Sequence, residues 1–405
     1  MKKKLYKGTA LDLIQAAYME RHVPLIYCYM LLDTAIDINR LKQAVRNTAK
    51  IVPQILCRYD ARKNTWLPAK YDSNSIVQVV SEQPCYEDLI WDLRIGPQLR
   101  IHIYRQKSGD FLQIAMSHIL TDGAGFQQYL SLLCEFYNEQ TLQVINEVNS
   151  RSLNPLLFHT PLNRLMYSKS HAEKGNMAAV LPLDQASAML HSIKVILSEE
   201  QLNSLQEKAK SLQITLNDLF MASYVYALKS FSLQSDIVLP CPADLRKFHT
   251  QKGQLTIANM TGKYLCHISP SKSDSLKELT LAIHQEMEQM KSQYACFHFI
   301  SLLHLLYRVL PVNLLQNITR AFYSIEQISY TNMGRLEEQQ ILFQDIVIKE
   351  CYLCGTYRKA PSFQVSISTY KNTCTMAVNL YGTNYQRNTG MQLLNDMKSA
   401  LLDEL

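Results

Sequence analysis

The chain contains the stretch Met116-Ser117-His118-Ile119-Leu120-Thr121-Asp122-Gly123-Ala124-Gly125, which decides how the rest is interpreted. The five residues before it, Phe111 to Ala115, are mostly apolar and predict a strand buried on both faces. After it, apolar side chains recur at helical spacing, namely Phe126, Tyr129, Leu130, Leu133 and Tyr137. His118 therefore ends a strand, a tight turn follows, and Asp122 opens a helix. This order holds an imidazole at the edge of a sheet.

The spacing His-x-x-x-Asp-Gly has two interpretations. In the first, His118 is a functional group, and Gly123 lacks a Cβ so that a ligand can approach the backbone closely. In the second, His118 is a hydrogen-bonded core residue and Asp122 is only a helix cap. A short motif remains a hypothesis until its structural context fits, and the strand–turn–helix context fits here.

Composition sets the broad class of the protein. The 405 residues suffice for about two or three domains, and 47% hydrophobic with 19% charged residues is typical of a globular protein with a sizeable core. The net charge of +6 comes from scattered side chains, so we expect no nucleic-acid partner. No apolar run approaches a membrane span, and no apolar signal segment follows Lys2-Lys3-Lys4. We expect a cytoplasmic protein with reduced thiols.

The ten cysteines show no regular spacing. Cys351-Tyr352-Leu353-Cys354 is a single CxxC pair, and a zinc site needs two further ligands at comparable spacing. None is evident. We therefore expect two ordinary buried cysteines and no metal site.

The pattern of predicted elements indicates an α/β protein, of the two-layer α+β type, in two halves. Residues 1–150 mix helices and strands, and an antiparallel hairpin turning at Lys107–Asp110 leads into the His118 strand. Residues 151–190 are interrupted by prolines and a glycine, which indicates a connecting segment. Residues 191–405 again predict strands with helices, without a strong sequence repeat of the first half.

The segment Trp91-Asp92-Leu93-Arg94-Ile95-Gly96-Pro97-Gln98-Leu99-Arg100, followed by the hairpin and the His118 motif, resembles one superfamily. This superfamily contains chloramphenicol acetyltransferase, the condensation domains of nonribosomal peptide synthetases and standalone acyltransferases such as alcohol acetyltransferases. Weaker resemblances follow in the family's order, at Leu56–Tyr59, Thr215–Leu228, Asp244–Arg246, Asn259–Gly262 and Ser329–Gly334. The resemblance implies two similar halves arranged as a V, with His118 in a tunnel between them.

Two departures refine the resemblance. Condensation domains usually carry two adjacent histidines, and here Ser117 stands in place of the first. The Asp-Phe-Gly-Trp-Gly motif of the plant branch is absent. Both favour a standalone bacterial-type acyltransferase.

The resemblance implies transfer of an acyl group from a thioester, carried by coenzyme A or by the phosphopantetheine arm of an acyl-carrier protein, to a hydroxyl or amine. His118 would be the general base, without an acyl-enzyme, because a neutral imidazole titrates near the working pH. No permanently bound cofactor is implied. Two alternatives remain open: a catalytically silent binding module, and a standalone amide-forming condensation enzyme. The sequence does not indicate acyl length, acceptor or oligomeric state.

Further site residues follow from the same resemblance. In the family, the acid equivalent to Asp122 pairs with an arginine that shapes the active-site loop; Arg58 is the first candidate and Arg246 the second. Ser329, Thr331 and Asn332 would line the far wall of the tunnel or bind an oxyanion. Alternatively, they form an ordinary polar strand end.

Overall fold

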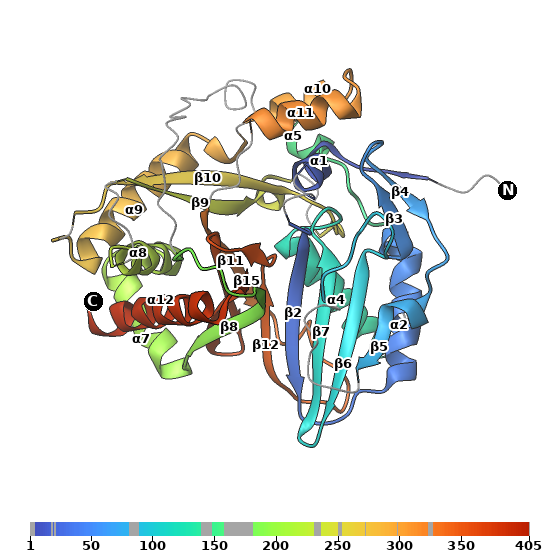
Figure 1. Cartoon of the computed structure of the whole chain (residues 1–405), viewed down its shortest axis with the longest axis horizontal. Coiled ribbons are helices and arrows are strands. Elements are labelled where there is room, and N and C mark those ends of the chain that lie inside the picture. The colour runs from blue at the N-terminus through green and yellow to red at the C-terminus, as the bar shows by residue number, and fades with distance from the viewer. Residues whose placement is uncertain are drawn as a thin grey trace.

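The computed structural model describes residues 5–17, 19, 22–80, 89–138, 148–157, 181–230, 236–249, 253–271, 273–297, 299–322 and 327–404. They form two lobes, each with a sheet and covering helices (Figure 1). The N-terminal lobe lies on the right of Figure 1 and the C-terminal lobe on the left.

The sheet of the N-terminal lobe has the strand order β12-β2-β7-β6-β5. Its strands are β2 (Leu25–Leu32), β5 (Val77–Val80), β6 (Leu99–Gln106), β7 (Gly109–Ser117) and β12 (Ile348–Cys354). The neighbours are antiparallel except β5 and β6. The predicted hairpin is confirmed as β6–β7. Gly109, at its turn, has φ +121°, and a Cβ there would lie 2.1 Å from the Leu32 carbonyl oxygen.

Two amphipathic helices, α2 (Ile38–Ile51) and α4 (Gly123–Tyr137), pack against each other and share one hydrophobic core with this sheet. A separate three-stranded sheet of β1 (Tyr6–Lys7), β4 (Thr65–Pro68) and β3 (Cys57–Asp60) lies beside it, and the short helix α3 (Ser73–Ile76) precedes β5. Strand β3 starts only at Cys57, because Pro53 first opens a turn of 3₁₀ helix that runs to Leu56.

The sheet of the C-terminal lobe has the order β11-β14-β15-β13, and β8 pairs with β15. Its strands are β8 (Met189–Leu197), β11 (Ile328–Leu336), β13 (Arg358–Lys359), β14 (Phe363–Tyr370) and β15 (Thr373–Gly382). The helices that contribute to its core are α7 (Glu199–Ser211), α8 (Leu216–Leu228), α9 (Leu276–Ser292), α10 (Ile300–Leu306), α11 (Val312–Phe322) and α12 (Asn384–Asp403). The short helix α5 (Asn154–Leu157) belongs to the connection.

A two-stranded ribbon, β9 (Ile237–Asp244) and β10 (Thr261–Ile268), runs from the C-terminal lobe towards helix α1 (Ala10–Ala16) (Figure 1). The end of this ribbon, where Asp244 pairs with Thr261, reaches the turn that follows β7. The ribbon thereby brings C-terminal residues to the His118 motif.

The predicted fold class, mixed α/β in two lobes, is confirmed. The residue ranges given to the halves need two corrections. Helix α1 buries Leu11, Leu13 and Ile14 in the core of the C-terminal lobe. Strand β12 pairs with β2 in the sheet of the N-terminal lobe. Apolar periodicity indicates that a segment is buried but not against which element it packs, so the sequence could not show these exchanges.

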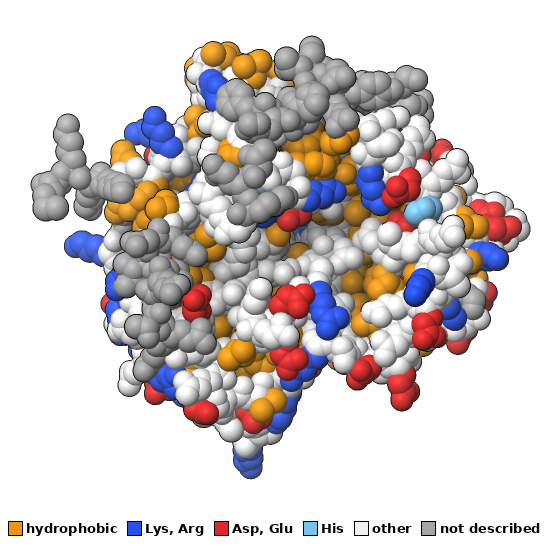
Figure 2. Space-filling model, turned by 180° about the vertical axis from the view of Figure 1, so that it is seen from behind, with side chains coloured by type: hydrophobic (Ala, Val, Ile, Leu, Met, Phe, Trp, Pro, Cys, Tyr) orange, Lys and Arg blue, Asp and Glu red, His pale blue; other side chains and the backbone are white. Residues whose placement is uncertain are grey.

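Among the helices in the described ranges, none is long and apolar enough to cross a membrane. Figure 2 shows acidic and basic side chains interspersed over one face of the molecule, in line with the scattered charges of the sequence.

Strand β12 should be a major source of stability, because it joins the two lobes through buried side chains. Leu353→Ala, at a side chain 1% exposed, should lower the free energy of unfolding by about 2–5 kcal/mol. The control Val347→Ala, at a side chain 55% exposed, should change it by less than about 0.5 kcal/mol. Urea unfolding measures both, and equal effects would show that β12 is not part of a shared core.

Candidate active site

His118 directly follows the last residue of β7 and is half-buried. Its backbone N–H donates to the Pro24 carbonyl oxygen at 2.7 Å, which continues the pairing of β7 with β2. Its ring Nδ1 lies 3.0 Å from the Thr121 carbonyl oxygen. A carbonyl oxygen only accepts, so Nδ1 carries the proton and Nε2 keeps its lone pair. Among the described residues none forms a hydrogen bond with Nε2.

The surroundings keep this imidazole neutral. Burial lowers the pKa of His118 from its ordinary 6.5, and the nearby Arg358 lowers it further, while Asp122 and the Thr121 carbonyl oppose the shift. The net direction is downward. At neutral pH the ring is therefore a base with a free lone pair.

The turn from His118 to Thr121 is held through its carbonyl groups. The Asn259 Nδ2 donates to the carbonyl oxygens of His118 and Ile119, at 2.7 Å each. The Arg151 Nη1 donates to the Leu120 carbonyl oxygen. The Thr121 carbonyl accepts from His118 itself, so all four carbonyl groups of the turn have a partner.

Asp122 caps helix α4 and also binds the C-terminal lobe. Its Oδ1 accepts from the Gly125 N–H at 2.8 Å, which is the predicted cap. Its Oδ2 accepts from the Met260 N–H at 2.6 Å and the Thr261 Oγ1 at 2.9 Å. Both oxygens also contact Arg246, through Nη2 and Nη1 at 3.0 Å each. The carboxylate thus joins the start of α4 to the ribbon β9–β10.

Burial by itself would raise the pKa of Asp122. The charge of Arg246 and the donors from Arg246, Gly125 and Met260 outweigh burial and hold the pKa below its ordinary value. The Arg246 pKa is raised, because the attraction of Asp122 and Asp244 exceeds the cost of burial. Both partners are therefore charged in the folded protein.

Arg246 is the partner of Asp122, and the preference for Arg58 was wrong. The Arg246 guanidinium also donates to the carbonyl oxygens of Thr256 and Ala258, each at 2.8 Å from Nη2. Arg58 is exposed on β3 and lines a cavity to which neither His118 nor Asp122 contributes. In the sequence, Arg58 lies within a strand and Arg246 comes just after one, so the local pattern does not show which of them pairs with Asp122. The position of the ribbon decides this.

A second buried ion pair supports the same turn and was not predicted. Asp12 on α1 is fully buried, and both its oxygens accept from the Arg151 Nη2, at 2.9 and 3.0 Å. Burial raises the pKa of Asp12 despite the opposing effect of Arg151. A carboxylate within the apolar face Leu11–Ile14 was the one signal in the sequence that could have indicated this pair.

Glycines allow the close packing around the motif. A Cβ at Gly125 would lie 2.2 Å from the Thr121 Oγ1 and 3.0 Å from the Ala258 carbonyl oxygen. A Cβ at Gly123 would lie 2.7 Å from the Met333 Sδ. The space at Gly123, expected to serve ligand approach, is thus taken up by a side chain of β11.

The three predicted wall residues on β11 divide into two groups. The Thr331 Oγ1 lies 3.9 Å from the Met333 Sδ, next to the start of α4, and the Ser329 hydroxyl is buried without a hydrogen-bond partner in the described ranges. The Asn332 Nδ2 instead donates to the Asn217 Oδ1 at 3.1 Å, at the start of α8. The Asn332 side chain therefore hydrogen-bonds to α8, whereas Thr331 lies beside Met333.

Both cysteines of the CxxC pair are buried in β12, and the Cys351 Sγ lies 3.8 Å from the Cys28 Sγ. In the described part of the chain, no three His, Cys, Asp or Glu side chains come together as a metal site would require.

No protein-family model matches the chain. An alignment 286 positions long is 22% identical to part of bacitracin synthase 3 of Bacillus licheniformis. It covers 62% of this chain and 4% of that protein's length.

Solved structures match over nearly the whole chain. The trichothecene 15-O-acetyltransferase TRI3 of Fusarium sporotrichioides has a TM-score of 0.71 at 12% identity, covering 98% of this chain and 94% of that one. The first condensation domain of the CDA synthetase, in complex with a substrate analogue, has a TM-score of 0.69 at 11% identity, covering 99% and 97%. Polyketide synthase associated protein 5 of Mycobacterium tuberculosis has a TM-score of 0.66 at 12% identity, covering 98% of each chain.

The chain has the condensation-domain fold. The resemblance seen in the sequence is thereby confirmed as a likeness of fold.

Within this condensation-domain fold, the Asp122–Arg246 pair should contribute strongly to stability. Asp122→Ala should lower the free energy of unfolding by about 3–5 kcal/mol, because it leaves the guanidinium of a side chain only 10% exposed without its main counter-charge. The control Asp92→Ala removes the exposed pair with Arg94 and should cost at most about 1 kcal/mol. Similar losses in the two variants, measured by urea unfolding, would contradict a structural role for Asp122.

The lowered pKa of His118 predicts that its ring titrates at a lower pH than a free imidazole side chain. NMR of the ring should give a midpoint below 6.5, and Arg358→Gln should raise that midpoint. Because the folded pKa lies below the unfolded value, the associated stability is complete above about pH 6.5 and is lost as pH falls through the folded pKa. A midpoint above 6.5 would show that the ring is not desolvated as described.

Proposed function

We propose that the protein is an acyltransferase that moves an acyl group from a thioester to a hydroxyl or amine acceptor, with His118 as the general base. The observation that carries this proposal is the hydrogen bond from the His118 Nδ1 to the Thr121 carbonyl oxygen, because it leaves the Nε2 lone pair available. The condensation-domain fold, shared with an acetyltransferase, supports a group-transfer role.

The reaction follows from the properties of a neutral imidazole. The His118 Nε2 takes the proton of the acceptor while the acceptor oxygen or nitrogen attacks the thioester carbonyl carbon. The tetrahedral intermediate then collapses, the carbon–sulfur bond breaks, and the leaving thiolate takes up the proton from the imidazolium. No acyl-enzyme is formed, and no cofactor other than the thioester takes part. Proton transfer of this kind contributes roughly 10²–10⁴-fold to the rate.

The remaining site residues have supporting roles in this proposal. Asp122 and Arg246 hold the turn that carries His118, and neither touches the reacting atoms. The backbone N–H of Gly123, the first residue of α4, has no intrahelical acceptor and is our candidate donor to the oxyanion. Thr331 and Ser329 of β11 are candidates for the opposite wall.

The path of the substrates is part of the same proposal. His118 lies where the turn after β7 meets the ribbon β9–β10, between the lobes. We propose that the donor reaches it from one side of this junction and the acceptor from the other. The donor would be acyl-coenzyme A or an acyl-carrier protein. The neutral, tethered imidazole favours an active enzyme over a silent binding module, since a module needs neither feature.

The test uses acetyl-, octanoyl- and palmitoyl-coenzyme A with a panel of alcohols and amines, measuring thiol release and product masses. His118→Ala should lower kcat/KM by about 10²–10⁴-fold, and wild-type kcat/KM should fall on the acid side with a midpoint below pH 6.5. The control His267→Ala removes a half-buried histidine of β10 and should leave the rate unchanged. Wild-type turnover by His118→Ala would refute the assignment.

A further inference from the structure

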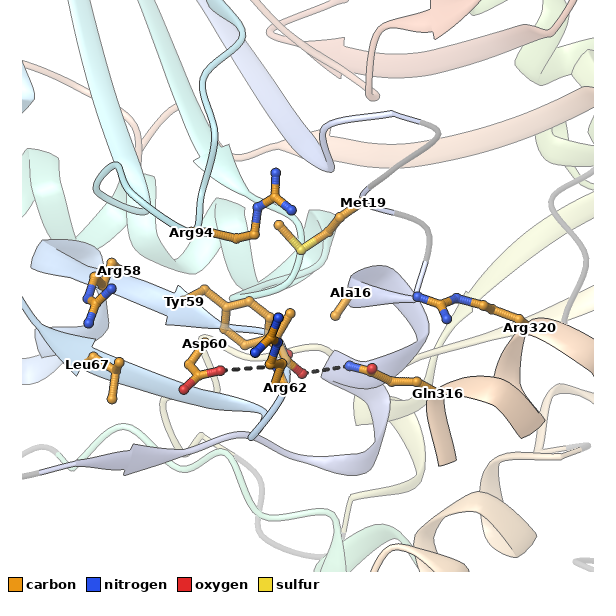
Figure 3. Close-up of a pocket in the computed structure, with 11 residues that line it drawn as sticks. Ala16, Met19, Arg58, Tyr59, Asp60, Arg62, Leu67, Arg94, Gln316 and Arg320 are labelled. Atoms are coloured by element: carbon orange, nitrogen blue, oxygen red, sulfur yellow. Dashed lines mark hydrogen bonds between the residues drawn. The ribbon is translucent and has the colours of Figure 1, made fainter. Parts of the chain in front are cut away.

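We propose that a cavity lined by arginines, to which the His118 turn does not contribute, binds a small molecule carrying a phosphate group. The cavity has a volume of about 470 Å³ and lies where the end of α1, the β3–β4 pair, the loop before β6 and α11 meet (Figure 3). None of the residues from His118 to Asp122 lines it. We call it the arginine cavity, and its binding function does not rest on the proposed acyl transfer.

Charge is the first feature that points to an anion. Four guanidinium groups line the arginine cavity, from Arg58, Arg62, Arg94 and Arg320, against one carboxylate, Asp60. The whole chain has 41 basic and 35 acidic side chains, so this excess is local. Figure 3 shows the four arginines arranged around the cavity, from segments far apart in the sequence.

Two of these arginines are anchored and two are unpaired. Arg94 is held by Asp92, with its Nε and Nη2 2.8–3.0 Å from the carboxylate oxygens. The Arg320 Nε donates to the Ala17 carbonyl oxygen at 3.0 Å. The side chains of Arg58 and Arg62 form no hydrogen bond or ion pair with any described residue. Because like charges held together repel, a bound anion would stabilise the arrangement.

The type of basic residue favours phosphate. All four lining cations are arginines, whose planar fork binds oxyanions bidentately, whereas lysine offers only a point charge. Guanidinium groups approach from several directions, and a phosphate ester presents more oxygens to satisfy them than one carboxylate does. Ala16, Met19 and Leu67 add an apolar wall, which suits an organic group attached to the phosphate. The volume lies within the range of small-molecule sites.

The walls of the arginine cavity are fixed without a ligand. Tyr59 is 1% exposed, and its hydroxyl donates to the Asn64 Oδ1 at 2.6 Å. The Gln316 Nε2 donates to the Ala61 carbonyl oxygen at 2.6 Å, which ties α11 to the β3–β4 turn. A preformed cavity of this kind loses little conformational entropy on binding.

Calorimetric titration of the full chain with butyl phosphate, inorganic phosphate and succinate tests the proposal. Butyl phosphate should bind most tightly, because it uses both the arginines and the apolar wall. Affinity should fall as sodium chloride rises, since exposed charges are screened. Arg58→Gln should weaken butyl phosphate binding about tenfold or more, because a charged hydrogen-bond donor is lost.

The control is Arg387→Gln on α12, which removes the same charge away from the arginine cavity. The Arg387 side chain hydrogen-bonds to its neighbour Asn388, and the variant should bind like wild type. The Arg58 side chain has no bonded partner in the described ranges, so Arg58→Gln should keep the wild-type melting temperature without ligand. The proposal is overturned if wild type binds no phosphate, if Arg58→Gln binds butyl phosphate as wild type does, or if succinate binds more tightly than butyl phosphate.

Discussion

The buried carboxylate of Asp122 joins the two lobes at the candidate active site. It accepts from the first turn of α4 in one lobe, and from Arg246, Met260 and Thr261 in the other. A carboxylate that is only 2% exposed is unfavourable unless it is fully hydrogen-bonded and paired. This requirement fixes where the end of the ribbon β9–β10 lies against the turn after β7.

The position of the ribbon in turn determines the conformation of that turn. Asn259, between Asp122's partners Arg246 and Met260 in the sequence, is brought to the carbonyl groups of His118 and Ile119. Arg151, which is paired with Asp12, donates a hydrogen bond to the Leu120 carbonyl oxygen. The Thr121 carbonyl is then the one left to face the imidazole, and it selects the tautomer with the proton on Nδ1. A charge pair that touches no reacting atom thus determines which ring nitrogen is basic.

Local patterns predicted the strand before His118, the helix after it, the Asp122 cap and the fold class. Each depends on neighbours within a few residues. The pairing of Asp122 with Arg246 rather than Arg58 spans 124 residues and depends on how β9–β10 packs, which no local pattern encodes. The support from Asp12, Arg151 and Asn259 was missed for the same reason. Strands β1 and β13 have two residues each, which are too few to show a period in the sequence.

The most direct test of this account is the tautomer of the His118 ring, from the ¹⁵N chemical shifts of the imidazole at pH 8. The structure predicts a protonated Nδ1 and an unprotonated Nε2, with a hydrogen bond from Nδ1. A ring protonated at Nε2 would mean that the turn does not hold the imidazole as described, and the general-base role would lose its structural basis.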